Sequence, residues 1–181
     1  DEVLNNIRNY ATRGNQKKLS ASEKAEIEAS KKRASDSIDF MFIGKKSLIK
    51  HWQKISAAER KEFIDTLRAL VEEIAYPKAR EYDGNAVQVA YIDVITEKDK
   101  SVIKTAFKYK NKEVFIDFWI HKPEGSSSWL ISDLIIEGES WIDNFRSQFN
   151  NIIQKKSFKE LLKMMKKKVA SAKKENKAKA K

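Results

Sequence analysis

The chain of 181 residues contains no cysteine, which excludes disulfide bonds, thiolate metal sites and cysteine nucleophiles. It also lacks a run approaching the eighteen or so consecutive apolar residues that a membrane-spanning helix requires. The sequence begins at Asp1 without a charged and then apolar leader, so an export signal is expected to have been removed or never to have been present. The length is sufficient for one domain with a sizeable hydrophobic core.

Glycine and histidine are also scarce, with five and two residues respectively. The isolated glycines form no phosphate-cradling loop and no G-x-S-x-G nucleophile turn. His51 and His121 do not have the spacing of a zinc-binding helix. Asp93, Asp117 and Asp133 lie in predicted strands and are the remaining candidates for acid–base chemistry. More often, such residues face solvent or bond a nearby donor, so the sequence favours a protein that is not an enzyme.

Positive charge is concentrated at the C-terminal end of the chain. The net charge is +11, and residues 155–181 carry twelve lysines, no arginine and two glutamates. The other residues carry 25 basic and 24 acidic side chains, so they are nearly neutral. Residues 170–181 have little to bury and are expected to form a Lys-rich, disordered tail after a single domain of residues 1–169.

The lysine-rich end allows three interpretations. It can be a solvated helix face with a disordered tail, or a segment attracted to anionic lipid head groups. Nucleic-acid binding is disfavoured because the tail has neither arginine nor interleaved aromatic residues.

Three sequences with the spacing of a capping box predict helix starts at Ser20, Ser56 and Ser157. The helix after Ser56 is expected to be the longest, with one apolar face, and Pro77 should kink or end it. The apolar face consists of Phe63, Leu67, Leu70, Val71 and Ile74. A shorter helical pattern is present in residues 1–19.

After Gly84 the hydrophobic period changes from helical to alternating. Four strands with short connections are predicted over residues 87–93, 103–109, 114–121 and 129–136, which indicates an antiparallel meander. Apolar residues occupy both faces of the last strand, so this strand should be covered on both sides. Helices before and after the strands indicate the α+β class.

The stretch of residues 129–149 combines a buried strand, a turn at Gly138 and an amphipathic helix that Ser140 can cap. The apolar stripe of this helix contains Ile142, Phe145, Phe149, Ile152 and Ile153. The strand and the helix are expected to form two walls of one apolar interior.

Two blocks of residues resemble the signature of the MlaC / toluene-tolerance family. The first contains Trp129, Asp133, Glu137, Gly138, Ser140, Asn144, Arg146, Gln148 and Phe149. The second contains Phe40, Gly44, Trp52, Ser56, Glu59, Arg60, Phe63, Tyr82 and Gly84. Glu139, Trp141 and Phe145 depart from the family pattern, which has an apolar residue, Leu and Tyr at these positions.

The resemblance implies a curved four-stranded antiparallel sheet wrapped by helices, similar to the NTF2-like cone, with an apolar pocket between the sheet and the helices. It implies a monomeric, non-enzymatic phospholipid carrier in the periplasm, with its signal peptide removed. Such a carrier serves an ABC-type lipid transport system and maintains the lipid asymmetry of the outer membrane.

The expected partners are phospholipid, an inner-membrane lipid ABC transporter complex, an outer-membrane lipoprotein complex and, transiently, the membrane surface. No nucleic acid is expected, and no cofactor apart from phospholipid bound as cargo. The alternative is an NTF2-like enzyme that acts on a small apolar substrate and uses one of the three aspartates as acid or base.

The candidate lipid-binding residues are large apolar side chains on the inward faces of the predicted elements. They are Phe42, Trp52, Phe63, Leu67, Leu70, Val71, Ile74, Val89, Tyr91, Phe107, Tyr109, Ile116, Phe118, Ile120, Trp129, Ile131, Ile135, Trp141, Phe145 and Phe149. Such faces usually form a filled core, and it is the family resemblance that favours a pocket. For the last strand, either Trp129, Ile131 and Ile135 or Leu130, Leu134 and Ile136 can point inward.

Overall fold

The computed structural model describes residues 20–79 and 87–179. The helical pattern of residues 1–19 and the family residues Tyr82 and Gly84 lie outside this description. The described chain forms two compact units, each built from two separate stretches of sequence. Unit 1 contains residues 20–39 and the sheet, and unit 2 contains the remaining major helices. One domain over residues 1–169 and an NTF2-like cone with a central pocket stay predictions.

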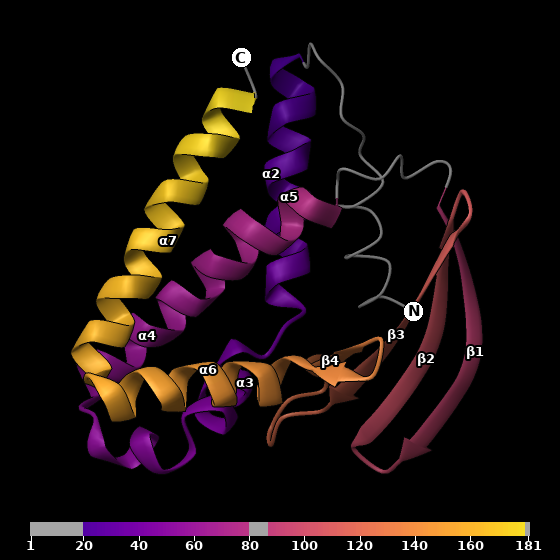
Figure 1. Ribbon diagram of the computed structural model, residues 1–181. Coiled ribbons are helices and arrows are strands. Elements are labelled where there is room, and N and C mark those ends of the chain that lie inside the picture. The colour runs from indigo at the N-terminus through magenta and orange to yellow at the C-terminus, as the bar shows by residue number, and fades with distance from the viewer. Residues whose placement is uncertain (1–19, 80–86, 180–181) are drawn as a thin grey trace. The chain divides into compact units, whose positions relative to one another are not determined.

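Unit 1 consists of helix α2 (Ala21–Asp36) and an open antiparallel sheet (Figure 1). The strands follow one another in chain order, so the predicted meander and the α+β class are confirmed. They are β1 (Gln88–Glu97), β2 (Lys100–Tyr109), β3 (Lys112–His121), β4 (Leu130–Ile136) and β5 (Glu139–Ser140).

The sheet has five strands, so the predicted number of four is wrong. Glu137 and Gly138 adopt φ values of 50° and 82°, and this left-handed turn sends the chain back along β4. Ser140 then pairs with Ile135 before the helix begins at Trp141. A strand of two residues is too short to show an alternating pattern, which is why the sequence did not predict it.

Two β-bulges change which side chains share a face of the sheet. The register shifts between Tyr91 and Asp93 in β1, and again in β4 where Ser132 stands between Ile131 and Asp133. Each bulge inserts one residue into one strand, so the residues beyond it reverse their faces. As a result Ile131 and Leu134 lie on one face and Ile135 lies on the other.

The segment after α2 is hydrogen-bonded to β4 within unit 1. The Ile131 N–H donates to the Ser37 carbonyl (2.8 Å), and the Asp39 N–H donates to the Ile131 carbonyl (2.9 Å). The Asp39 carboxylate lies 2.9 Å from Nε2 of His121 on β3, with both side chains largely buried. His121 is therefore engaged in holding this segment to the sheet.

Unit 2 is helical, and the predicted capping boxes explain where two of the helices of the chain begin. Ser20 in unit 1 and Ser56 in unit 2 each accept a hydrogen bond from the backbone of the glutamate three residues later, which bonds back to the serine N–H. The unit contains α3 (Phe40–Leu48), the 3₁₀-helix η1 (Ile49–Lys54), α4 (Ala57–Leu70), the π-helix η2 (Val71–Ala75), α6 (Trp141–Lys155) and α7 (Phe158–Lys179).

Pro77 does not end the helix that precedes it. The chain first widens into η2, where the Tyr76 N–H bonds the Val71 carbonyl five residues earlier. It then continues as α5 (Tyr76–Ala79), with Pro77 as its second residue. Pro77 has no N–H to donate to the Glu73 carbonyl four residues earlier, and the Asn176 side chain donates to that carbonyl instead (2.9 Å).

The lysine-rich end differs from the predicted disordered tail, because α7 extends to Lys179. Leu161, Met165 and Val169 anchor the first half of this helix in buried positions. In the second half, the Asn176 side chain donates to the Glu73 carbonyl (2.9 Å) and so supplies an anchor that hydrophobic periodicity does not reveal. Among the described residues, no helix is long and apolar enough to cross a membrane.

Candidate functional site

One face of the sheet in unit 1 is almost entirely apolar, and we call it the apolar sheet face. The pairing register places Val94, Ile103, Phe118 and Leu134 opposite one another across β1 to β4. Large side chains from the neighbouring rows extend the surface in both directions along the strands. The apolar sheet face contains Val89, Tyr91, Val94, Ile103, Phe107, Tyr109, Val114, Ile116, Phe118, Ile120, Ile131, Leu134 and Ile136.

Burial decreases across the apolar sheet face from β4 towards the edge strand β1. Ile131 is fully buried and Phe118 is 3% exposed, whereas Tyr91 and Val94 are 53% and 57% exposed. Phe107, between these extremes, is half-buried and packs its ring 6.4 Å from that of Phe118. The face therefore offers apolar side chains that the described residues leave partly uncovered, which is the property expected of a surface for an apolar ligand.

The opposite face carries rows of charge. Lys104 stands between Asp93 and Asp117 in the register, and Lys108 pairs with Glu113 at 3.1 Å. Such cross-strand pairs of opposite charge are typical of a face that contacts water. The opposite face also exposes Ile95, Phe115 and Trp119 by 46–48%, so the two faces differ by these charged rows rather than by a lack of apolar side chains.

Two of the three candidate acid–base aspartates form local hydrogen bonds, and Asp117 lies opposite Lys104 in the register. Asp93 accepts a hydrogen bond from the N–H of Val94 (2.8 Å). Asp133 accepts from the N–H of Leu134 (2.8 Å) and from the hydroxyl of Ser140 (2.5 Å). These are local backbone and turn contacts of the ordinary structural kind.

Potential metal ligands are likewise not gathered in one place. His51 contacts Asn150 in unit 2 at 3.0 Å, while His121 contacts Asp39 in unit 1. Over residues 20–79 and 87–179, no three His, Asp or Glu side chains lie close enough together to hold a metal ion.

Unit 2 contains a chain of aromatic rings that links α4, α6 and α7. The Phe149 ring stacks on Phe145 at 5.4 Å and meets Phe63 edge-on at 5.6 Å. Trp141 and Phe158 extend the chain at its two ends, each with a centroid distance of 6.0 Å. Phe63 and Phe149 are buried and close the core of the unit, whereas Trp141 and Phe145 are partly exposed.

Helices α3 and α4 approach closely at Gly44. A Cβ atom at this position would overlap Cδ1 of Ile64 and lie 3.1 Å from the ring of Phe63. Phe63 is fully buried, so its ring has little room to move. Gly44, which belongs to the family signature, thus allows two helices of unit 2 to pack against each other.

The candidate residues predicted in unit 1 mostly lie together, with two exceptions. All of them except Trp129 and Ile135 lie on the apolar sheet face. The expectation that Ile131 and Ile135 point to the same side is wrong, because of the bulge at Ser132. Trp129 precedes β4, and Nζ of Lys122 lies 4.9 Å from the centre of its ring in a cation–π contact.

The sequence analysis also missed several members of the apolar sheet face. They are Val94, Ile103 and Val114, whereas Leu134 and Ile136 were offered as the alternative set for the last strand. The interruption of the alternating pattern at Asp93 was a signal of the first bulge, but no comparable signal marks Ser132. A register shift of one residue is enough to reverse the face of every later side chain.

The candidate residues predicted in unit 2 have mixed environments. Trp52, Phe63, Leu67, Val71 and Phe149 are buried, and Phe42, Leu70, Ile74, Trp141 and Phe145 are half-buried. Trp52 has a clear structural partner, since Arg60 lies 5.2 Å from its ring and donates to its carbonyl (3.0 Å). These contacts of Trp52 link η1 to α4.

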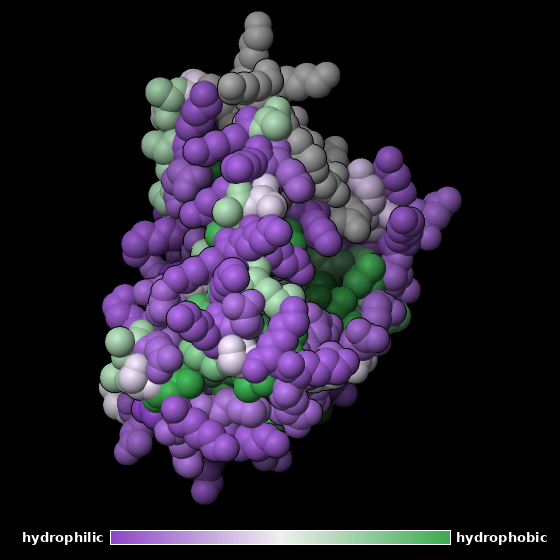
Figure 2. Space-filling view, turned by 60° about the vertical axis from the view of Figure 1, so that its left-hand side comes forward, coloured by the Kyte–Doolittle hydropathy of each residue, from purple (hydrophilic) through white to green (hydrophobic). Residues whose placement is uncertain are grey.

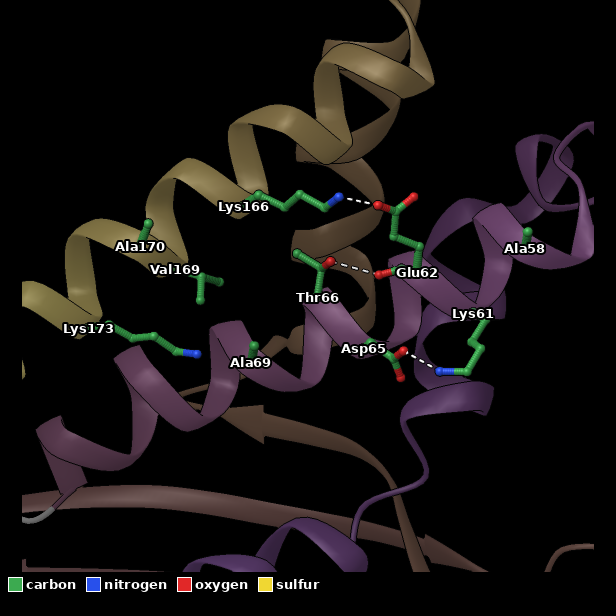
Figure 3. A pocket seen from close by; sticks show the side chains of 10 residues that line it. All are labelled: Ala58, Lys61, Glu62, Asp65, Thr66, Ala69, Lys166, Val169, Ala170 and Lys173. Atoms are coloured by element: carbon green, nitrogen blue, oxygen red, sulfur yellow. Dashed lines mark hydrogen bonds and ion pairs between the residues drawn. The ribbon is translucent and has the colours of Figure 1, made fainter.

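A groove of about 560 Å³ runs between α4 and α7 in unit 2 (Figure 3). Its floor is made of short side chains and its rim is charged. Both acidic residues of its lining are paired, Asp65 with Lys61 at 2.6 Å and Glu62 with Lys166. The lining residues are Ala58, Lys61, Glu62, Asp65, Thr66, Ala69, Lys166, Val169, Ala170 and Lys173.

Comparisons with known proteins agree with this fold. The family model described as "MlaC protein" matches residues 4–167. The structure is similar to that of a phospholipid-binding protein from Ralstonia solanacearum, determined in complex with a phospholipid, with a TM-score of 0.76. The two sequences are 13% identical and the match covers 94% of each chain, so this likeness shows a shared fold. No curated protein matches the chain.

Proposed function

Because this chain belongs to the MlaC family, we propose that it binds phospholipid and carries it between membranes. Its acyl-chain surface is the apolar sheet face, with Phe107, Ile116 and Phe118 at its centre. The observation that carries this assignment is the decrease in burial from Ile131 to Val94 across one continuous apolar surface. The solved protein of the same fold, which holds a phospholipid, supports the same class of ligand.

The energetics of acyl chains make such a carrier workable. Transferring about thirty methylene groups from water to an apolar surface gains on the order of 24 kcal/mol, at ~0.8 kcal/mol each. A bilayer provides nearly the same gain, so exchange between bilayer and protein can be close to balanced. Free lipid in water is then negligible, and the partner complexes rather than the carrier determine the direction of transfer.

Family membership also supports the cellular setting that we propose. The carrier acts in the periplasm, receives or delivers phospholipid at an inner-membrane lipid ABC transporter complex, and does the reverse at an outer-membrane lipoprotein complex. This traffic maintains the lipid asymmetry of the outer membrane. The protein has no catalytic role, and phospholipid is its cargo rather than a cofactor.

The test is native mass spectrometry of the purified full chain, followed by extraction and identification of the lipid. A matched pair of variants, Phe107→Gln and Phe115→Gln, tests which face of the sheet binds the lipid. Phe107 lies on the apolar sheet face, and Phe115 lies on the opposite face in the adjacent strand. We expect stoichiometric phospholipid in the wild-type chain and in Phe115→Gln, and loss of most of it in Phe107→Gln. Equal lipid content in the two variants contradicts the assigned surface, and a lipid-free wild-type chain that stays so after incubation with vesicles contradicts the proposed function.

A further inference from the structure

The lysines of α7 gather along one side of the helix. At 100° per residue, they fall on a flank beside the buried line of Leu161, Met165 and Val169. Over 18 residues at 1.5 Å each, this flank is about 27 Å long. It consists of Lys159, Lys163, Lys166, Lys167, Lys173, Lys174 and Lys177, which we call the lysine stripe.

Acidic side chains neutralise only a small part of the lysine stripe. Lys163 lies 3.4 Å from Glu160, and Lys166 pairs with Glu62 of α4. The other members form no ion pair with any residue of the described ranges, and their side chains are exposed. Figure 2, which turns the left-hand side of Figure 1 and thus α7 forward, shows a largely hydrophilic surface.

The positive charge belongs to one flank rather than to the whole helix. The other exposed flank carries Glu160, Met164, Lys168 and Glu175, and its charges nearly cancel. Met164 is 42% exposed there. A helix that needed lysines only for solubility would distribute them over both exposed flanks. The segregation indicates a partner with an extended negative surface.

The chemistry of the stripe favours a plane of phosphate groups. Lysine is a flexible point charge that needs no fixed geometry, whereas arginine supplies the bidentate contacts of shaped sites. Residues 155–181 contain no arginine, and Phe158, the one aromatic residue among them, is half-buried in contact with Phe63. Neither base stacking nor bidentate phosphate recognition is therefore available for a nucleic acid.

We propose that the lysine stripe docks this protein on the surface of a bilayer that contains anionic phospholipid. The choice of a bilayer over another anionic surface rests in part on the proposed function, since a phospholipid carrier must approach the membranes it serves. The stripe keeps α7 against the head groups through charge alone. The contact is weak, reversible and sensitive to ionic strength.

The experiment measures binding of the full chain to phosphatidylglycerol vesicles and to phosphatidylcholine vesicles at low and high salt. The stripe variant is K167Q/K174Q/K177Q, and the control is K45Q/K54Q/K112Q, which removes the same charge from exposed lysines elsewhere. At about fivefold per lysine, the stripe variant should bind phosphatidylglycerol vesicles roughly 100-fold more weakly, and the control only a few-fold. K167R/K174R/K177R should bind as the wild-type chain does, because it retains the charge.

Three results overturn the proposal. The first is an equal loss of vesicle affinity in the stripe variant and the control, and the second is wild-type binding that is the same for anionic and neutral vesicles. The third is failure of the arginine variant to bind. Tight RNA binding that depends on the stripe, without binding to phosphatidylglycerol, also overturns it. Native mass spectrometry of the same samples reports bound lipid separately. A lipid-free chain that still binds through its stripe contradicts the proposed function and leaves the docking surface intact.

Discussion

Replacement of Gly44 by alanine tests the close approach of α3 and α4. The added Cβ would overlap Cδ1 of Ile64, and its distances to Phe63 Cε1 and Leu67 Cδ2 would be 3.1 and 3.6 Å. Ile64 is partly exposed and can turn its terminal methyl away, but the fully buried Phe63 must shift by a few tenths of an ångström. The structure therefore predicts strain from both contacts, the displaced methyl group of Ile64 and the crowded ring of Phe63.

Two effects of known size oppose each other in Gly44→Ala. Alanine in a helix interior is favoured over glycine by about 1 kcal/mol, whereas overpacking a filled core costs about 1–3 kcal/mol. Because the contact with Phe63 is tight and its ring is enclosed, we expect overpacking to win. The free energy of unfolding should fall by about 1 kcal/mol, measured by urea denaturation with tryptophan fluorescence.

A double-mutant cycle with Ile64→Val separates packing from backbone effects. Valine lacks Cδ1, the atom that the new methyl group overlaps, so Gly44→Ala should cost at least ~0.5 kcal/mol less in the Ile64→Val background. Gly138→Ala is the control: it has φ +82° and no neighbour within 4 Å, so its cost is backbone strain alone and should not depend on residue 64. A Gly44→Ala variant as stable as the wild-type chain, or an additive cycle, refutes the close helix contact.

Four further predictions concern the ligand surface and the helix caps. Val94→Lys should lower bound phospholipid in native mass spectra more than Ile95→Lys, because these exposed neighbours point to opposite faces; the reverse order contradicts the assigned face. Chemically delipidated protein should unfold at lower urea concentration than the lipid-bound protein, since ligand binds the folded state, and coincident curves argue against cargo binding. Ser56→Ala should lower stability by about 1 kcal/mol at neutral pH through loss of the cap, and no change in urea midpoint would contradict it. Hydrogen bonds from the Ser56 backbone and hydroxyl lower the pKa of Glu59 from 4.5. The contribution of Glu59 to folding stability should therefore be present above pH 4.5 and be lost as the pH falls through the folded-state pKa. A Glu59→Gln variant whose stability difference from the wild type is unchanged by acid would contradict this.

Hydrophobic periodicity and capping residues were sufficient to predict most elements of the fold. The alternation in residues 103–109 and 114–121 gave two strands with correct faces, because β2 and β3 pair without a bulge. The serine–glutamate pairs gave the helix starts, because the capping box is closed by residues three positions apart. Family signature residues in two blocks indicated the family that the comparison then showed.

Only the tertiary structure decided which apolar residues share a surface. The bulge at Ser132 unites Ile131 with Leu134 and Ile136, and it depends on pairing with β3 rather than on local sequence. The helical continuation of residues 170–179 depends on α4, η2 and α7 packing together, including the bond from Asn176 to Glu73. The sequence by itself determines hydrophobic periodicity and helix capping, because both depend on residues a few positions apart. Register and burial arise from contacts between residues far apart in the chain.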